Sequence, residues 1–223
     1  MHVGLIVGIG PAATDFYYRR LIHALALAEA PLDLTMAHAD TATLLRNQAA
    51  GDRVAQVAIY VRLAERLKAA GASALAITSI AGHFCIGEFL AVSPLPAIDL
   101  LSVVNRALVA RGLQRVGILG TRVVMETRFY GAAAATEIIP PAGEALQAVH
   151  DAYVAMASSG SITAAQRETF FAAGRAMMRD RGAEAIMLGG TDLALAFGGH
   201  DPGFPTFDCA AVHADAIAAA AMS

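Results

Sequence analysis

The stretch VGLIVG at Val3–Gly8 is matched later in the chain by RVGILG at Arg115–Gly120. In both, a short apolar run ends in glycine, which is typical of a buried parallel strand followed by a tight turn. A second pair repeats in the same way, with GASALAITSIA starting at Gly71 and GAEAIMLGGTD starting at Gly182. The first pair is 113 positions apart and the second pair 111. Two similar offsets favour an internal duplication of one α/β unit, although apolar strands also resemble one another by chance.

Strands and helices alternate through the first half of the chain. Helical spacing is expected from the first glycine turn to about Glu29, and again over Asp52–Ala70, which closes at Gly71. Two further strands are expected at Leu32–Ala37 and Ala74–Thr78, the second of them almost entirely apolar. Alternation of this kind predicts an α/β fold with mainly parallel sheets.

The repeat divides the chain into two predicted domains. A boundary is expected near Leu100, after a proline-rich stretch. The final segment, Phe204–Met222, is expected to form a strand and an alanine-rich helix that returns to the first domain. The first domain would then hold residues 1–100 and 205–223, and the second would hold residues 101–204.

Composition excludes several classes of protein. Of the 223 residues 57% are hydrophobic, but 51 of them are the small residue alanine, and the bulky uncharged stretch Phe89–Ile98 is too short to span a bilayer. A net charge of -3 without a Lys/Arg cluster argues against nucleic-acid binding. Two cysteines cannot form a disulfide framework, and no signal peptide precedes the first strand, so we expect a cytoplasmic protein.

The first glycine turn has three possible roles. Gly8–Ala13 (GIGPAA) has the spacing of a dinucleotide fingerprint with alanine as its third small residue, and Asp33 or Asp40 lies at roughly the expected distance. The proline after the second glycine removes an amide that such a site would use. The stretch is therefore a tight turn, an anion site formed by Gly10 and Thr14, or a dinucleotide site.

Four motifs follow one another in the order found in a known protein family. They are GIGPAAT (Gly8–Thr14), ILGTRVVMETRFY (Ile118–Tyr130), LGGTDL (Leu188–Leu193) and FDCAAVHADA (Phe207–Ala216). With these motifs the chain resembles the aspartate/glutamate/hydantoin racemase superfamily, and most of all its broad-specificity aspartate/glutamate racemase branch. The resemblance implies two pseudo-symmetric α/β domains, an active site in the cleft between them, no cofactor, and a homodimer.

The resemblance also implies a mechanism that this sequence does not match. In the family, a cysteine from each domain flanks the substrate Cα, and one thiolate removes a proton while the other thiol returns one. The motifs Cys-Asn-Thr-x-His and Gly-Cys-Thr-Glu correspond here to Ser79–His83 (SIAGH) and Gly189–Asp192 (GGTD). Ser79 and Gly190 therefore stand where the cysteines are expected. Serine needs an adjacent base and glycine carries no proton, so two-thiol racemisation is not supported.

Other residues of these motifs remain candidates for a site. The catalytic candidates are Ser79, His83 and Asp192. A histidine after a strand can act as a general acid or base, or can be a hydrogen-bonded structural residue, and Asp192 can alternatively cap a helix. The expected substrate-binding residues follow the predicted strands and are Gly10, Thr14, Thr78, Thr121, Arg122, Gly190 and Thr191. Arg122 can alternatively be a surface arginine.

Some polar and aromatic residues have simpler interpretations. Cys85 and Cys209 are either displaced nucleophiles or small buried apolar residues. The cluster Phe16–Tyr18 is expected in the core or at a dimer contact. The remaining histidines lack metal-ligand spacing, so no metal site is predicted; they are His2, His23, His38, His150 and His200.

The sequence thus predicts a protein that binds a small carboxylic or amino acid between its domains. The first hypothesis is a cofactor-independent isomerase-type enzyme whose chemistry has diverged, because Ser79 and Gly190 replace the two thiols. A decarboxylase or lyase acting on a related carboxylate is an alternative. A second alternative is a catalytically silent small-molecule binding protein. A third alternative is a nucleotide-dependent oxidoreductase. No nucleic-acid or membrane partner is expected.

Overall fold

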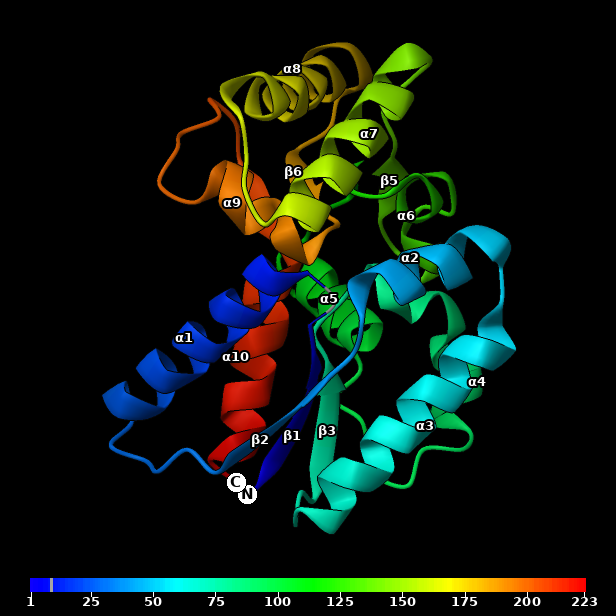
Figure 1. The fold of residues 1–223 in the computed structure, drawn as a ribbon. Coiled ribbons are helices and arrows are strands. Elements are labelled where there is room, and N and C mark those ends of the chain that lie inside the picture. The colour runs from blue at the N-terminus through cyan, green and yellow to red at the C-terminus, as the bar shows by residue number, and fades with distance from the viewer. Residues whose placement is uncertain (9) are drawn as a thin grey trace. The chain divides into compact units, whose positions relative to one another are not determined.

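The computed structural model describes residues 1–8 and 10–223, so Ile9 of the first glycine turn lies outside the described residues. The chain forms two compact units. Unit 1 contains Met1–Leu100 and Ala211–Ser223, and unit 2 contains Leu101–Ala210. Both chain ends lie at the same end of unit 1 (Figure 1), where the Met1 ammonium group donates a hydrogen bond to the carbonyl of Ala221.

The sheet of unit 1 has three parallel strands in the order β2-β1-β3. The strands are β1 (Val3–Val7), β2 (Leu34–His38) and β3 (Ala74–Ile77). The chain runs from β1 to a neighbour on one side, and then back across β1 to the other side. Right-handed crossovers therefore place the connecting helices on opposite faces, as Figure 1 shows for α1 (Pro11–Leu27) and α3 (Arg53–Ala69).

Short helices complete unit 1. They are α2 (Thr41–Ala50), the 3-10 helix η1 (Ala81–Cys85), α4 (Ile86–Leu90) and α10 (Cys209–Ala221), which begins in unit 2. Helix α10 lies beside α1, and Arg20 of α1 forms an ion pair with Asp215 of α10 at 2.7 Å. The sequence did not predict α2, which begins where the Asp40 carboxylate accepts a hydrogen bond from the Thr43 amide.

The sheet of unit 2 has four parallel strands in the order β5-β4-β6-β7. The strands are β4 (Arg115–Leu119), β5 (Glu137–Ile139), β6 (Ala185–Leu188) and β7 (Thr206–Asp208). The helices are α5 (Leu100–Ala110), α6 (Arg122–Glu126), η2 (Phe129–Gly131), α7 (Glu144–Ser159), α8 (Ala164–Arg181), η3 (Thr191–Leu193) and α9 (Ala194–Phe197). The predicted α/β class with parallel sheets is confirmed.

Strand β7 differs from the expected domain limits. The sequence analysis placed residues 205–210 with the first domain. In the structure β7 pairs with β6, with Phe207 opposite Met187, so this short segment lies in unit 2. The chain returns to unit 1 only within α10.

The two units repeat one strand register. Val3 pairs with Ala74 in unit 1, and Val116 pairs with Ala185 in unit 2. The next position of each central strand is glycine, where the nearest helix packs closely. A Cβ on Gly4 would lie 2.9 Å from Leu67 of α3, and a Cβ on Gly117 would lie 3.0 Å from the Met177 sulfur of α8. The repeated glycine therefore serves close helix–sheet packing.

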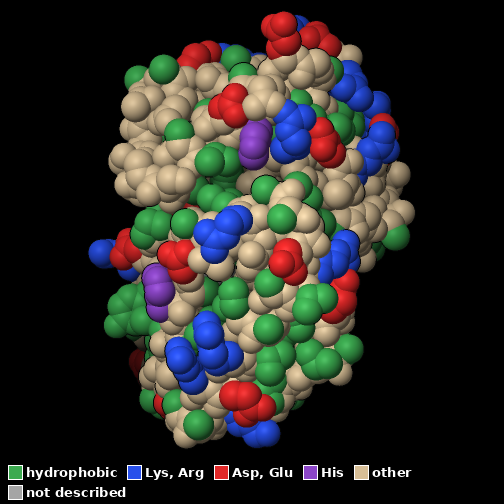
Figure 2. Space-filling view, turned by 45° about the vertical axis from the view of Figure 1, so that its right-hand side comes forward, with side chains coloured by type: hydrophobic (Ala, Val, Ile, Leu, Met, Phe, Trp, Pro, Cys, Tyr) green, Lys and Arg blue, Asp and Glu red, His purple; other side chains and the backbone are tan. Residues whose placement is uncertain are grey.

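The aromatic cluster of α1 divides between core and surface. Tyr17 is fully buried, whereas Tyr18 is 42% exposed. On the face shown in Figure 2, Lys and Arg side chains are interspersed with Asp and Glu side chains. None of the helices in the described part of the chain combines the length and apolar character that a membrane span requires.

A left-handed turn follows α6 in unit 2. Arg128, Phe129 and Tyr130 have φ values of 51°, 61° and 57°, and Gly131 continues the turn at 69°. The left-handed region costs roughly 1–2 kcal/mol for each residue with a Cβ. Burial of the whole Phe129 side chain in the core helps to offset this cost, and the Thr127 hydroxyl accepts a hydrogen bond from the Tyr130 amide at 3.0 Å.

We expect Arg128→Gly to raise the free energy of unfolding by about 1 kcal/mol, because glycine adopts positive φ without the Cβ penalty. The matched control is Arg62→Gly on the exposed face of α3, which should lower the free energy of unfolding by about 1 kcal/mol. Urea unfolding of both variants measures the two effects. Destabilisation by both substitutions would contradict a strained turn at Arg128.

Candidate functional site

In parallel α/β sheets, ligands bind at the carboxyl ends of the strands. Each unit has such an edge, and the predicted site residues come directly after its strands. In unit 1 they come after β1 and β3, and in unit 2 they come after β4 and β6. The predicted residues thus form two groups, one in each unit.

The glycine turn after β1 is completed by two threonine hydroxyls. Gly8 has φ +89°, and a Cβ there would lie 2.2 Å from the His38 ring. The Gly8 amide donates to the Thr14 hydroxyl at 3.0 Å. The Gly10 amide donates to the Thr41 hydroxyl at 3.2 Å, and that hydroxyl donates to the Gly8 carbonyl at 2.6 Å. These bonds fit the tight-turn interpretation, and ligand binding by Gly10 and Thr14 stays a prediction.

The two acidic residues considered for a dinucleotide site have other roles. Asp40 caps α2. The Asp33 carbonyl accepts a hydrogen bond from the Val3 amide, so Asp33 lies at the amino end of β1, away from the glycine turn. The structure therefore does not support a dinucleotide site at this turn.

Three predicted residues come after β3 and are almost completely buried. The Thr78 hydroxyl donates to the Ile6 carbonyl at 3.2 Å and ties β3 to β1. The Ser79 hydroxyl accepts a hydrogen bond from the Gly82 amide at 3.2 Å. His83 Nδ1 lies 2.5 Å from the Ser79 carbonyl oxygen. Ser79 and His83 are thus brought together by the single turn of η1.

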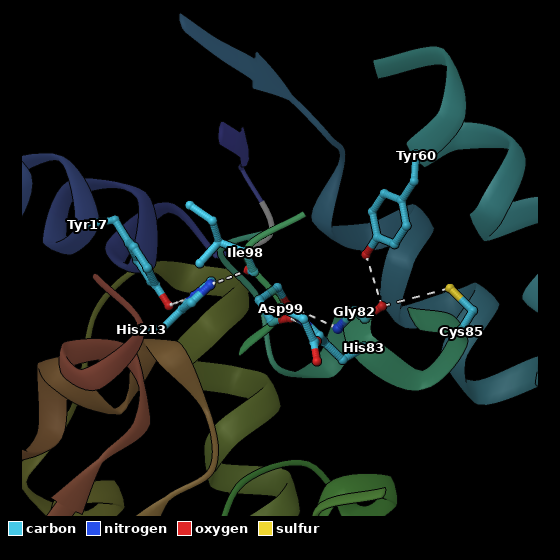
Figure 3. Close-up of polar contacts among 9 residues, drawn as sticks. Tyr17, Tyr60, Gly82, His83, Cys85, Ile98, Asp99 and His213 are labelled. Carbon is cyan, nitrogen blue, oxygen red and sulfur yellow. Dashed lines mark hydrogen bonds and ion pairs between the residues drawn. The ribbon is translucent and has the colours of Figure 1, made fainter. Parts of the chain in front are cut away.

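This contact fixes the tautomer of His83. A carbonyl oxygen can only accept, so Nδ1 carries the proton and Nε2 of the neutral ring carries the lone pair. Nε2 lies 3.8 Å from Oδ1 of Asp99, which the sequence analysis did not select (Figure 3). Burial lowers the pKa of His83, and the charge of Asp99 partly opposes this shift. The residue is therefore a neutral base near pH 7.

A second buried histidine fixes the segment that carries Asp99. The Tyr17 hydroxyl donates to Nδ1 of His213 at 2.9 Å, and Nε2 of His213 donates to the Ile98 carbonyl at 2.8 Å (Figure 3). Burial lowers the pKa of His213 to about 3. His213 lies in the FDCAAVHADA motif, but sequence alone did not indicate that α10 would reach the residue preceding Asp99.

The residues after β4 have contacts within unit 2. The Thr121 hydroxyl accepts a hydrogen bond from the Val124 amide at 3.4 Å and caps α6. Arg122 forms an exposed ion pair with Glu126 at 2.9 Å, and its amide donates to Nδ1 of His150 at 3.1 Å. This fits the surface alternative for Arg122, and a ligand role for Thr121 and Arg122 stays a prediction.

Two glycines after β6 allow close packing. A Cβ on Gly189 would lie 2.8 Å from the Leu119 carbonyl oxygen of β4. A Cβ on Gly190 would lie 2.2 Å from Cε2 of Tyr153, a tyrosine of α7 that the sequence analysis did not single out. Any side chain at position 190 therefore competes with the buried Tyr153 ring.

Tyr153 also contacts the third catalytic candidate. Its hydroxyl donates to Oδ2 of Asp192 at 3.3 Å, and both side chains are buried. Burial and the charge of Asp192 raise the pKa of Tyr153 well above its usual value. The adjacent Thr191 hydroxyl is buried and has no hydrogen-bond partner among residues 1–8 and 10–223. A buried hydroxyl of this kind has capacity for a ligand or a water molecule.

Comparison with known proteins assigns the chain to a family. A family model described as Asp/Glu/Hydantoin racemase matches residues 6–217. The chain belongs to this family. Among solved structures, a candidate Asp/Glu racemase from Yersinia pestis is 25% identical, with a TM-score of 0.84 and 100% coverage of both chains.

Two further solved structures share this fold. An aspartate racemase homologue from Pyrococcus horikoshii OT3 is 21% identical, with a TM-score of 0.81, and covers 100% of this chain and 99% of its own. The aspartate racemase of Picrophilus torridus is 16% identical, with a TM-score of 0.71, and covers 99% of this chain and 94% of its own.

The two cysteines of this racemase-family protein are buried. Burial raises the pKa of Cys85 to about 12, and it raises the pKa of Cys209 well above its usual value. The thiolate is the nucleophilic form, so both residues fit the alternative of small buried apolar side chains.

We expect the free energy of unfolding to fall as the pH decreases from about 6.5 toward 3. Unfolded His213 binds a proton below about pH 6.5, whereas folded His213 stays neutral until about pH 3, so acid favours the unfolded state. His213→Gln should reduce this pH dependence, and His23→Gln on the exposed face of α1 should leave it unchanged. Urea unfolding at a series of pH values measures the slope, and an unaltered slope in His213→Gln would contradict the assignment.

We expect Gly190→Ala to lower the free energy of unfolding by about 1–3 kcal/mol, because the new methyl group displaces a packed ring. The cost should fall in a Tyr153→Ala background, which forms a double-mutant cycle. Gly87→Ala, where a Cβ meets nothing within 4 Å, is the control and should not destabilise the protein. An equal cost of Gly190→Ala in both backgrounds would show that the ring is not what requires the glycine.

Proposed function

We propose that this racemase-family protein is a cofactor-independent isomerase-type enzyme acting on a small carboxylic or amino acid. Family membership supports the class of reaction. Buried polar groups at the carboxyl edge of each sheet support a site for a small polar ligand. The chemistry proposed here does not use two thiols, because Cys85 and Cys209 are buried with raised pKa values.

The observation that carries this proposal is the fixed tautomer of His83. Nδ1 is bonded to the Ser79 carbonyl, so Nε2 is the atom that can take a proton from the substrate. In the proposed step, Nε2 accepts the Cα proton, and the electron pair of the broken C–H bond moves into the substrate carboxylate. Asp99, 3.8 Å from Nε2, stabilises the imidazolium that forms.

The Ser79 hydroxyl of unit 1 is proposed to hold the substrate. The Ser79 hydroxyl accepts the Gly82 amide, so its own proton can be donated to a carboxylate oxygen. In unit 2 the buried Thr191 hydroxyl, without a partner in the described part of the chain, is proposed to bind a ligand or a water molecule.

A silent binding protein is the second candidate. Its support is that both cysteines are buried with raised pKa values, so neither thiol is readily available as a nucleophilic thiolate. Binding without turnover would favour it. A decarboxylase or lyase would instead consume the carboxylate substrate.

We expect the wild-type protein in deuterium oxide to exchange the Cα proton of at least one of L-aspartate, D-aspartate, L-glutamate or D-glutamate, measured by proton NMR. His83→Gln should slow this exchange by about 100-fold or more, because loss of a general base costs that much. The control is His23→Gln, which changes an exposed histidine of α1 and should retain the wild-type rate.

Three outcomes separate the candidates. Exchange that depends on His83 supports the isomerase. A ligand-induced rise in melting temperature without exchange supports the binding protein, because a ligand that binds only the folded state stabilises it. Loss of the carboxylate signal with release of carbon dioxide supports the decarboxylase.

A further inference from the structure

Residues Pro96–Asp99 (PAID) of unit 1 are repeated as Pro205–Asp208 (PTFD) in unit 2. In each unit this segment pairs with the strand that precedes the catalytic candidates, β3 or β6. The Leu75 amide donates to the Pro96 carbonyl at 2.9 Å, and the Ile186 amide donates to the Pro205 carbonyl at 2.9 Å. A helix begins directly after each aspartate, α5 in the first case and α10 in the second. The aspartate therefore has a repeated place in the fold.

The helix after this segment carries a different residue in each copy. Five positions after Asp208, α10 has His213, and five positions after Asp99, α5 has Val104. Both side chains are fully buried. Valine shows that an apolar side chain can fill this helix position, whereas a buried imidazole requires hydrogen-bond partners. Packing alone therefore does not account for the histidine.

His213 uses both of its ring nitrogens in hydrogen bonds. A carbonyl oxygen only accepts, so Nε2, which lies 2.8 Å from the Ile98 carbonyl oxygen, carries the proton. Nδ1 accepts a hydrogen bond from the Tyr17 hydroxyl at 2.9 Å (Figure 3). The Tyr17 ring also packs edge-on against the imidazole, with the ring centroids 5.6 Å apart. These contacts give His213 one tautomer and one orientation.

The hydrogen bond from His213 acts on the peptide group that leads into Asp99. The Ile98 amide donates to the Leu75 carbonyl at 2.8 Å, which fixes Ile98 beside β3. The Ile98 carbonyl belongs to the peptide group of the Asp99 amide, so the His213 bond sets the direction in which the chain leaves the sheet. Oδ1 of Asp99 then lies 3.8 Å from Nε2 of His83, and the Asp99 side chain is only 14% exposed.

We propose that His213 is a positioning residue for the His83 base and acts by holding Asp99 beside Nε2 of His83. This inference rests on the proposed function, in which that nitrogen takes the Cα proton. The residues that it uses all belong to unit 1. In the repeat that starts at Gly71 and Gly182, the position that matches His83 is Ala194. The pair of histidines around the repeated aspartate is therefore particular to unit 1.

The charge of Asp99 increases the basicity of His83. Burial lowers the pKa of His83, and the Asp99 charge partly opposes this shift. In the described residues, the titratable groups that face His213 are Tyr17 of α1, His83 of η1 and Asp99 before α5. Because the pKa of His213 is about 3, this residue adds no charge beside His83 near neutral pH. Loss of His213 should thus weaken the effect of Asp99, and the pKa of His83 should fall.

The test replaces His213 by valine, the residue at the matching position of α5. In full-length His213→Val the pKa of His83, measured by NMR titration, should fall. Exchange of the substrate Cα proton requires neutral His83, so the acid limb of its rate should move to lower pH. The kcat for exchange should fall by about 10- to 100-fold, because small displacements of catalytic groups have effects of this size. The KM should not change, because Ser79 is untouched.

Three further variants separate positioning from a general loss of packing. His213→Gln keeps an N–H for the Ile98 carbonyl and an oxygen for the Tyr17 hydroxyl, so it should restore the pKa of His83 and the kcat toward wild type. Ile217→Ala removes a fully buried side chain one turn later in α10 and should lower the free energy of unfolding without changing either quantity. Asp99→Asn should itself lower the pKa of His83, and adding His213→Val should then cause no further fall.

The outcomes distinguish this inference from the proposed function. An unchanged pKa of His83 and an unchanged kcat in a folded His213→Val overturn the positioning role and leave the proposed function standing. An equal change in Ile217→Ala, a failure of His213→Gln to restore the kcat, or a full further fall in the double variant with Asp99→Asn also overturns it. Absence of exchange in the wild-type protein overturns the proposed function, and the role of His213 in the reaction with it.

A milder variant covers the case in which His213→Val does not fold. Tyr17→Phe keeps the ring that packs on His213 and removes the hydroxyl that donates to Nδ1. The pKa of His83 should fall in this variant too, by less than in His213→Val. Since the NMR titration needs no substrate, an unchanged pKa of His83 in Tyr17→Phe would overturn the positioning role in that case.

Discussion

Each unit depends on one constraint. The central strand pairs in parallel with the strand that directly precedes the catalytic candidates. It joins β1 to β3 in unit 1 and β4 to β6 in unit 2. Close packing at the end of the second pair leaves no room for side chains, as the contact between Gly189 and the Leu119 carbonyl shows. A short 3-10 helix after each pair carries candidate groups, which are His83 in unit 1 and Thr191 and Asp192 in unit 2, and Ser79 lies just before the first of these helices. The positions of these groups thus depend on backbone pairing.

The internal repeat could be predicted from sequence because short local patterns of residues carry it. The glycines at positions 4 and 117 and the apolar strands around them are visible without any structure. Sequence reasoning also selected His83 and Asp192 as candidates, because both belong to family-like motifs that follow apolar strands, and their roles stay predictions. It did not find α2, which has only 10 residues, or the membership of β7 in unit 2, which is decided by pairing with β6.

The partners of the candidate residues were beyond sequence reasoning for a physical reason. Asp99 meets His83 across a gap of 16 positions in sequence, in an irregular segment without a periodic signal. Tyr153 reaches Gly190 from a different helix, and its hydroxyl finds Asp192, 39 positions away. Such contacts depend on how helices pack on the sheet. In sequence, the buried residues of α7 all give the same apolar signal, so none of them stands out.

Unit 1 is built from two separate stretches of the chain, and this affects the order in which the units can fold during translation. Helix α10 provides His213 for the Ile98 carbonyl, Asp215 for Arg20 and the Ala221 carbonyl for the amino terminus. Unit 2 is one continuous stretch, Leu101–Ala210, and all of it precedes these residues. During translation the second unit can therefore close while the first still lacks its last helix. The buried histidine pair of unit 1 is then completed after unit 2, and His83 acquires its final surroundings only when α10 has left the ribosome.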